Sequence, residues 1–174
     1  GIGMVEVATI MPKPAVLVQA LPAMLMRMQV AAQGFPVSDV VKTRLVLESE
    51  VMQSLASRTP TPDLRAAVEL LDSMEDAALS AEEFLLLDAQ FHVALADAAG
   101  NQVIAAMMTG LRESIEAYVL AGVQIDSWPS TCMRLRDEHR GLVDAVNAGD
   151  GELARQRIVG HIRGYYSESA HSSR

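Results

Sequence analysis

The sequence is poor in cysteine and in aromatic residues. Cys132 is the one cysteine among 174 residues, so no internal disulfide can form, which fits a reducing cytoplasm. Aromatic residues make up only 4% of the chain, whereas Ala, Leu and Met are abundant, and this composition favours helices over sheets. We therefore expect a helical protein located in the cytoplasm.

Basic residues are also scarce relative to acidic ones. The formal net charge is -8, and a surface that holds nucleic acid by itself needs clustered Lys and Arg to contact phosphates. This balance excludes a chain that binds DNA unaided.

No long uninterrupted hydrophobic run is present. The most apolar stretch, residues 15–32, is broken by Gln19, Pro22, Arg27 and Gln29, which makes it a poor membrane span. The start of the chain also lacks the basic residues of a secretion signal. With 50% apolar residues the chain has ample material for one packed, soluble domain, and we expect no membrane contact.

Start and stop signals divide the chain into segments. Residues 1–14 combine residues that favour extended structure with Pro12 and Pro14, which predicts a linker, and residues 15–36 are predicted to form a helix. The main domain is predicted at residues 37–169. The polar residues 170–174 are predicted to be a disordered tail. Further helices are expected after five signals, which are Ser38, Thr61–Pro62, Ser80–Glu83, Gly100–Asn101 and Asn147–Asp150. These signals predict an all-helical protein.

Two polar residues stand out on the apolar face of the helix expected at 84–99. Asp88 and His92 are one turn apart and share that face with Phe84, Phe91 and Leu95. A buried carboxylate or imidazole needs a partner, because burying it alone costs several kcal/mol. The Asp-x-x-x-His spacing suits a divalent cation, although the spacing alone is weak evidence.

Two more histidines occupy predicted inward positions. His139 and His161 lie on later helices where an aliphatic residue is expected, so three imidazoles and one carboxylate share the core side of three helices. A lone core histidine is usually satisfied by one hydrogen bond, but this set is a suitable first shell for zinc, nickel or manganese. An octahedral ion would keep two positions open for water or for the carboxylate of a small acid.

Arg44 and Glu48 form another polar pair on an apolar helix face. The two residues are four apart and can pair with each other or with a neighbouring helix. Alternatively, Arg44 faces a cavity and holds a carboxylate through its planar guanidinium.

Catalysis is less well supported than binding. No His-Glu-x-x-His motif occurs, and Glu48 and Glu138 are weak candidates for a general base. We therefore expect no enzyme. A metal-dependent enzyme acting on a small acid and a purely structural, dimerising helical bundle are the two alternative readings.

Several short motifs occur together in a specific order. The chain resembles the effector-binding (FCD) domain of FadR-like GntR-family transcription regulators over about residues 38–166, through Arg44-x-x-x-Glu48, Asp88-Ala89-Gln90-Phe91-His92, Ala99-Gly100-Asn101, Glu138-His139, the segment 145–150 and His161.

The resemblance implies an antiparallel bundle of about six to seven helices and a homodimer. It implies a divalent metal, zinc as first choice with nickel or manganese as alternatives, held by Asp88, His92, His139 and His161. A small carboxylic-acid effector would bind beside it, and we assign Arg44, Glu48, Asn101 and Arg136 to that ligand site. It also implies an N-terminal winged-helix domain before residue 1, of which residues 1–14 would be the remnant of the wing and the linker and 15–36 a connecting helix. Operator DNA would be bound only through that domain.

Overall fold

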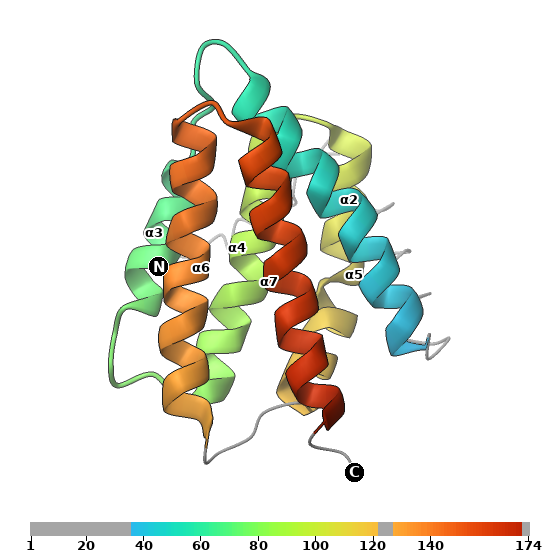
Figure 1. Cartoon of the computed structure of the whole chain (residues 1–174), viewed down its shortest axis with the longest axis vertical. Coiled ribbons are helices and arrows are strands. Elements are labelled where there is room, and N and C mark those ends of the chain that lie inside the picture. Colours follow the sequence, from blue (N-terminus) through green and yellow to red (C-terminus); the bar gives the residue numbers. More distant parts are fainter. Residues whose placement is uncertain (1–35, 122–126, 172–174) are drawn as a thin grey trace, which may run out of the picture.

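The structure is a computed structural model that describes residues 36–121 and 127–171. Within these ranges it is helical throughout and contains no strand, which confirms the predicted all-helical class (Figure 1). The helices are α2 (Val37–Ser57), α3 (Arg65–Met74), α4 (Ala81–Ala99), α5 (Gln102–Ala121), α6 (Trp128–Asn147) and α7 (Gly151–His171).

The helices pack as an antiparallel bundle around α4. Helices α6 and α7 are joined by a tight turn and lie side by side, and α2 packs along the other side of α7 (Figure 1). Helix α4 contacts α2, α3 and α5. Inward side chains of α2, α4, α6 and α7 therefore meet in one core.

The predicted start of α4 is confirmed. Ser80 caps the helix: its hydroxyl accepts a hydrogen bond from the Glu83 amide at 3.2 Å, while the Glu83 carboxylate accepts from the Ser80 amide at 2.8 Å. This capping box satisfies two amide groups that the first helical turn would leave unpaired. It fixes where α4 begins and so helps place Asp88 and His92 on the buried face.

The boundaries of two other elements of the bundle are also confirmed. Gly100 ends α4 with a positive φ of 77°, a conformation that favours glycine. The Asn101 side chain then accepts hydrogen bonds from two amides of α5, and the Asp150 side chain accepts from the Leu153 amide at the start of α7. Asn101 and Asp150 thus act as helix caps.

Two predicted helix starts are wrong. Ser38 does not cap α2, because α2 already begins at Val37 after Pro36, and the Ser38 hydroxyl points to Asp39 at 3.4 Å. Thr61–Pro62 does not start α3, which begins only at Arg65, whose amide donates to the Asp63 carboxylate at 3.0 Å. Helix α3 ends at Met74.

The core is apolar apart from one group of polar side chains. The largest fully buried residues are Met52, Leu55, Met74, Phe84, Leu85, Phe91, Leu95, Met108, Leu135, Leu142 and Ile158. Among the described residues, the buried polar and charged side chains are Arg44, Glu48, Asp88, His92, His139 and His161. All six lie on positions that the sequence predicted to face inward.

Parts of the predicted domain map lie outside the described residues. The linker at 1–14 and nearly all of the connecting helix at 15–36 fall there, and so do residues 172–174 of the predicted tail. Helix α7 extends to His171, the second residue of the segment 170–174.

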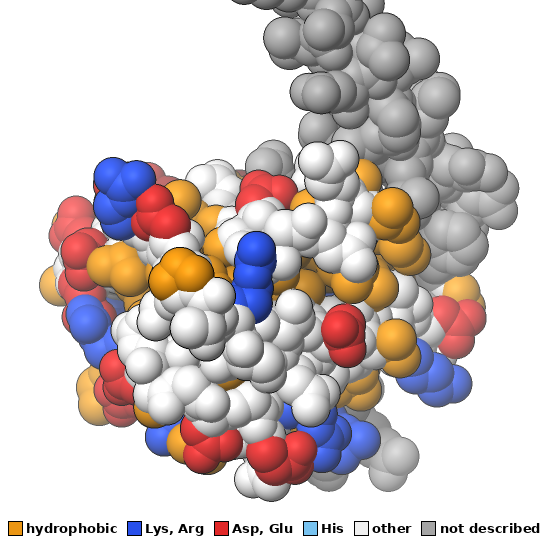
Figure 2. Space-filling model, turned by 90° about the horizontal axis from the view of Figure 1, so that it is seen from above, with side chains coloured by type: hydrophobic (Ala, Val, Ile, Leu, Met, Phe, Trp, Pro, Cys, Tyr) orange, Lys and Arg blue, Asp and Glu red, His pale blue; other side chains and the backbone are white. Residues whose placement is uncertain are grey.

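The surface gives two further observations. In the face shown in Figure 2, acidic and basic side chains are interspersed with apolar ones over the described part of the surface. No helix in the described ranges has the length and apolar character needed to cross a membrane.

Candidate metal centre

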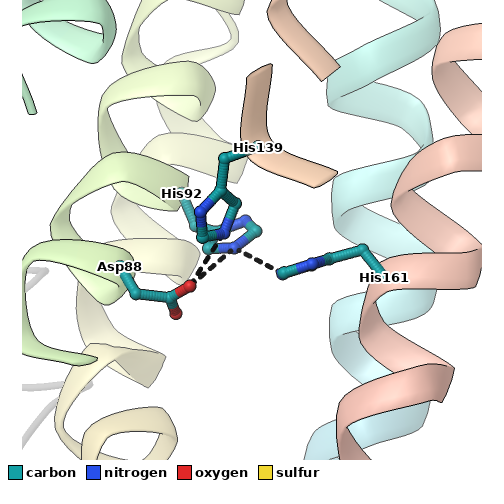
Figure 3. A group of neighbouring side chains, drawn as sticks. All are labelled: Asp88, His92, His139 and His161. Atoms are coloured by element: carbon teal, nitrogen blue, oxygen red, sulfur yellow. Dashed lines mark hydrogen bonds and ion pairs between the residues drawn. The ribbon is translucent and has the colours of Figure 1, made fainter. Parts of the chain in front are cut away.

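Asp88, His92, His139 and His161 converge on one point in the core. Asp88 and His92 come from adjacent turns of α4, His139 from α6 and His161 from α7, and all four side chains point toward one another (Figure 3). One ligand atom from each residue lies within 4.8 Å of the corresponding atoms of the other three. Their burial is nearly complete, with exposed fractions of 0–4%.

The separations suit a single ion. The Asp88 carboxylate oxygen Oδ1 lies 2.8 Å from Nε2 of His139 and 3.9 Å from Nε2 of His92. Nε2 of His92 lies 3.2 Å from Nε2 of His161. Two ligand atoms at the usual metal distance are about 3.0 Å apart when at right angles and about 4.2 Å apart when opposed. All three observed distances fall within or close to this range.

His139 provides the sharpest test of that fit. Its Nε2 is within 2.8 Å of Asp88, yet the direction of its N–H does not satisfy hydrogen-bond geometry, and neither ring nitrogen has a hydrogen-bond partner among the described residues. Buried polar atoms without a partner are rare, because each costs about 1–3 kcal/mol. His139 and Asp88 are therefore close without the orientation of a hydrogen bond, as expected for two ligands of one cation.

The electrostatics also favour a cation. Burial opposes ionisation of Asp88, but the close approach of His139 and of the imidazoles of His92 and His161 outweighs burial and lowers the pKa of Asp88 below its ordinary value. Burial lowers the pKa of His161 from 6.5 to about 4, so this imidazole is neutral at pH 7. An ionised carboxylate and a neutral imidazole are the forms in which these side chains bind metals.

Behind His92 lies a buried chain of charged groups on α2. Nδ1 of His92 is 2.6 Å from Oε2 of Glu48, and Oε1 of Glu48 is 2.6 Å from Nε of Arg44. Nη1 of Arg44 donates to the hydroxyl of Tyr166 on α7 at 3.3 Å. Glu48 thus bridges Arg44 and His92, so the two forms of pairing that the sequence allowed for Arg44 and Glu48, with each other and with a neighbouring helix, are both present.

Arg44 and Glu48 stabilise each other's charged forms. Burial alone raises the pKa of Glu48, but Arg44 and His92 outweigh it and lower that pKa from 4.5 to about 2. Burial likewise lowers the pKa of Arg44, and Glu48 outweighs it, so the pKa of Arg44 is raised. Nη2 of Arg44 is buried and has no hydrogen-bond partner in the described part of the chain.

His161 has a carboxylate behind it as well. Its Nδ1 lies 2.8 Å from Oε2 of Glu138, whose other oxygen accepts a hydrogen bond from Nη1 of Arg134 at 2.6 Å. These hydrogen bonds outweigh the effect of burial and lower the pKa of Glu138. Two of the three histidines therefore have Nδ1 next to a carboxylate and turn Nε2 toward the cluster.

The structure does not bring Asn101 and Arg136 into this cluster. Asn101 is exposed and caps α5 through its side-chain oxygen. Arg136 donates from Nε to the carbonyl of Met74 at 2.8 Å and from Nη2 to that of Asp76 at 3.2 Å. A guanidinium at the end of α3 satisfies carbonyls that the helix leaves free. Of the four residues assigned to the ligand site, Glu48 contacts His92 of the candidate metal centre, and Arg44 contacts Glu48.

Comparison with known proteins identifies the family. The family model described as the FCD domain matches residues 39–164. This chain belongs to the FCD domain family. The match begins two residues into α2 and ends within α7, so it includes every residue of the candidate metal centre. The resemblance seen in the sequence is thereby confirmed.

Named relatives of this FCD domain are transcription regulators. One, from Escherichia coli K12, is named as a regulator of the L-lactate dehydrogenase operon and is 27% identical over 71% of this chain and 48% of its own length. The HTH-type transcriptional regulator LutR of Bacillus subtilis 168 is 25% identical over 76% of this chain and 65% of its own. The chain thus spans about half to two thirds of these relatives.

A solved structure shares the fold. The Streptococcus agalactiae GntR structure superposes on the FCD domain with a TM-score of 0.59 and 24% identity, covering 79% of this chain and 58% of that one. The relatives named above are transcription regulators, in agreement with the prediction that this chain is not an enzyme.

Sequence reasoning missed two contacts at the centre of this FCD domain. Glu138 was considered only as a weak general base, and its i, i+4 spacing from Arg134 predicts an ion pair on one helix but not the contact with His161 on α7. Tyr166 was given no role in the site, and its contact with Arg44 joins residues 122 positions apart. No local pattern indicates either contact.

Proposed function

We propose that this FCD domain is the effector-sensing part of a transcription regulator. In this proposal it binds a divalent metal and a small organic acid and so controls operator binding by a DNA-binding domain elsewhere in the regulator. The observation that carries the proposal is the buried convergence of one carboxylate and three imidazoles whose ligand atoms lie within 4.8 Å of one another. Membership of the FCD domain family supports the regulatory role.

The metal would be held by Asp88, His92, His139 and His161. Three imidazoles and one carboxylate suit zinc first, and nickel or manganese as alternatives. The ion would supply open coordination positions for the oxygen atoms of an acid. The neutral state of His161 at pH 7 means that this ligand is ready to bind without first losing a proton.

Arg44 is the residue best placed to recognise the acid. Nε is taken by Glu48 and Nη1 by Tyr166, but Nη2 is buried with no hydrogen-bond partner among described residues. A carboxylate oxygen would satisfy this donor in a charge-assisted hydrogen bond. The contact of Glu48 with both Arg44 and His92 connects this donor to the metal cluster.

Helix α2 is the element through which the signal would leave the site. It carries Arg44 and Glu48, packs along α7, and is the first described helix after residues 1–35. An acid shifts the arrangement of α2 only as far as it binds one arrangement better than another. In a homodimer, which the regulator is proposed to form, such a shift would change the spacing of two DNA-binding domains.

The metal is tested by replacing His139 with Ala. We expect zinc at about one hundred times its Kd to raise the free energy of unfolding of the wild-type domain by about 2.7 kcal/mol, because the ion binds only the folded state. His139→Ala should lose this gain and should retain no zinc in elemental analysis.

The control for that experiment is Leu142→Ala on the same helix. Leu142 is fully buried but offers no ligand atom, so this variant should unfold more easily yet keep the zinc-dependent gain. Zinc-dependent stabilisation that survives His139→Ala would contradict the proposed metal centre.

The acid site is tested by comparing two conservative variants. Arg44→Lys keeps a positive charge beside Glu48 but removes the Nη2 donor, so we expect it to weaken the stabilisation by small carboxylates at least tenfold in apparent Kd. Arg136→Lys changes an arginine that binds helix carbonyls and should leave that Kd unchanged. A thermal-shift screen of zinc-loaded protein with small mono- and dicarboxylates measures both, and an unchanged Arg44→Lys response would remove Arg44 from the acid site.

A further inference from the structure

Glu138 faces away from its neighbour His139 and toward a different ligand. His139 is fully buried in the cluster, whereas Glu138 is 29% exposed and reaches His161 on the next helix. The 2.8 Å contact joins Oε2 of Glu138 to Nδ1 of His161. Of these two adjacent residues of α6, His139 is a candidate ligand, whereas Glu138 contacts the candidate ligand His161.

This contact decides which nitrogen of His161 is free. A carboxylate accepts hydrogen bonds, so Nδ1 of His161 must carry the proton and donate it to Glu138. The lone pair is then on Nε2, the atom that lies 3.2 Å from Nε2 of His92 at the centre of the cluster. The contact therefore selects the tautomer that a metal needs.

Glu138 is itself held in place. Its second oxygen accepts a hydrogen bond from Nη1 of Arg134 one turn earlier on α6, at 2.6 Å. With both oxygens engaged, the carboxylate has little freedom to rotate away from His161. The ring of His161 is thereby fixed in orientation as well as in tautomer.

We infer that Glu138 is a positioning residue of the metal centre, which holds His161 by Nδ1 so that Nε2 is presented to the ion. This inference rests on the proposed metal-binding function and adds a residue outside the ligand set. Carboxylates in this position orient the imidazole and increase its basicity, and their loss costs about ten- to hundredfold in metal affinity.

The location of Glu138 makes a clean experiment possible. It lies in a surface depression between α6 and α7, together with Asp137, Arg140, Asp144 and Arg157. Asp137 is exposed, carries the same charge and precedes Glu138 on α6, but it has no described contact with a histidine of the centre. Asp137→Ala is therefore a control with the same charge change at the neighbouring position.

The experiment measures zinc affinity by competition with a chromogenic chelator. We expect Glu138→Ala to raise the Kd for zinc about ten- to hundredfold, Glu138→Gln to raise it less because its amide oxygen still accepts from Nδ1, and Asp137→Ala to leave it within about twofold. Imidazole ¹⁵N spectra of the zinc-loaded protein give a second readout, in which the protonated Nδ1 signal of His161 should shift or broaden in Glu138→Ala only.

The outcomes separate the two proposals. A wild-type domain that binds zinc while Glu138→Ala binds it equally well, with an unchanged His161 spectrum, overturns the positioning role and leaves the metal centre intact. A wild-type domain that takes up no zinc overturns the metal centre itself and the role of Glu138 with it. A loss of affinity shared by Asp137→Ala would show a general charge effect and would also overturn the inference.

Discussion

Two histidines of the candidate metal centre each have Nδ1 next to a glutamate carboxylate, and the two glutamates differ in burial. Glu48 contacts His92 inside the core and is 3% exposed, whereas Glu138 contacts His161 at the edge of a surface depression and is 29% exposed. Each is paired with an arginine one turn away on its own helix, Arg44 for Glu48 and Arg134 for Glu138. The same histidine–glutamate–arginine arrangement therefore occurs once in the buried core and once at the solvent-exposed surface.

This difference in burial predicts different effects of the two glutamates on the free energy of unfolding and on metal affinity. A charge that is buried with its partner becomes very costly when that partner is removed, because water cannot replace the lost contact. A charge near the surface can be solvated instead, and its ion pair contributes little to stability. We therefore expect Glu48 to matter for folding and metal binding together, and Glu138 chiefly for metal binding.

The largest expected effect is that of Glu48→Ala. This variant leaves Arg44 buried without its counter-ion, and we expect it to lower the free energy of unfolding of the metal-free domain by about 3–5 kcal/mol. Urea titration at pH 7 in the presence of a chelator measures this loss.

Two further variants sharpen that result. Glu138→Ala, measured in the same way, should lose no more than about 1 kcal/mol. The double variant Arg44→Met with Glu48→Leu removes both charges and should recover much of the stability, since an apolar pair can replace a buried ion pair. Equal losses for Glu48→Ala and Glu138→Ala would show that burial does not distinguish the two sides.

The next effect is a difference in pH dependence between the two sides. The pKa of His161 falls from 6.5 unfolded to about 4 folded, so between these values the unfolded chain binds a proton that the folded chain does not. Stability of the metal-free domain should therefore decrease on acidification from pH 6.5 to 4, by at most about 1.4 kcal/mol per pH unit from this group. Glu48, with a pKa lowered from 4.5 to about 2, should act by the same logic only between pH 4.5 and 2.

His161→Gln tests this separation of pH ranges. The variant removes the group that titrates in the upper range, so its stability should depend less on pH between 6.5 and 4 than that of the wild type. Below pH 4, where His161 no longer contributes to the slope, the two curves should run parallel, because Glu48 is unchanged. Chelator-treated protein followed by circular dichroism in urea at each pH gives the comparison, and an unaltered upper slope would remove His161 as its source.

The sequence predicted the helices and the inward position of the four clustered side chains better than the contacts around them. The capping box at Ser80–Glu83 is a local signal, and together with the 3.6-residue period it places Asp88 and His92 on the buried face of α4. Inward positions of His139 and His161 follow from the same period on α6 and α7. Convergence on one point needs the packing of three helices, and the sequence supported it only through the order and spacing of family motifs.

The remaining features depend on contacts that no local pattern encodes. Arg136 was assigned to the ligand site, but its guanidinium donates to the Met74 carbonyl at the end of α3, 62 residues earlier in the chain. Thr61–Pro62 has the order of residues typical of a helix start, yet α3 begins only after Leu64. For Arg136 the outcome depends on a contact between residues that are distant in sequence, which no local pattern encodes.

The smallest expected effect concerns salt, and it compares the two ion pairs directly. Screening acts over about 10 Å at 0.1 M salt and about 3 Å at 1 M, but only where ions and water can enter. The stability loss caused by Glu138→Gln, at most about 1 kcal/mol at 0.1 M, should therefore shrink by a few tenths of a kcal/mol at 1 M sodium chloride. The loss caused by Glu48→Gln should stay the same, because the Arg44–Glu48 pair is closed to solvent. Glu152→Gln, which disrupts the exposed pair with Arg155, provides the reference for a fully screened contact. If the Glu48→Gln loss shrank as much as that of Glu152→Gln, water would have to reach the inner pair, and the contrast between a dry and a solvated support for the same metal centre would no longer hold.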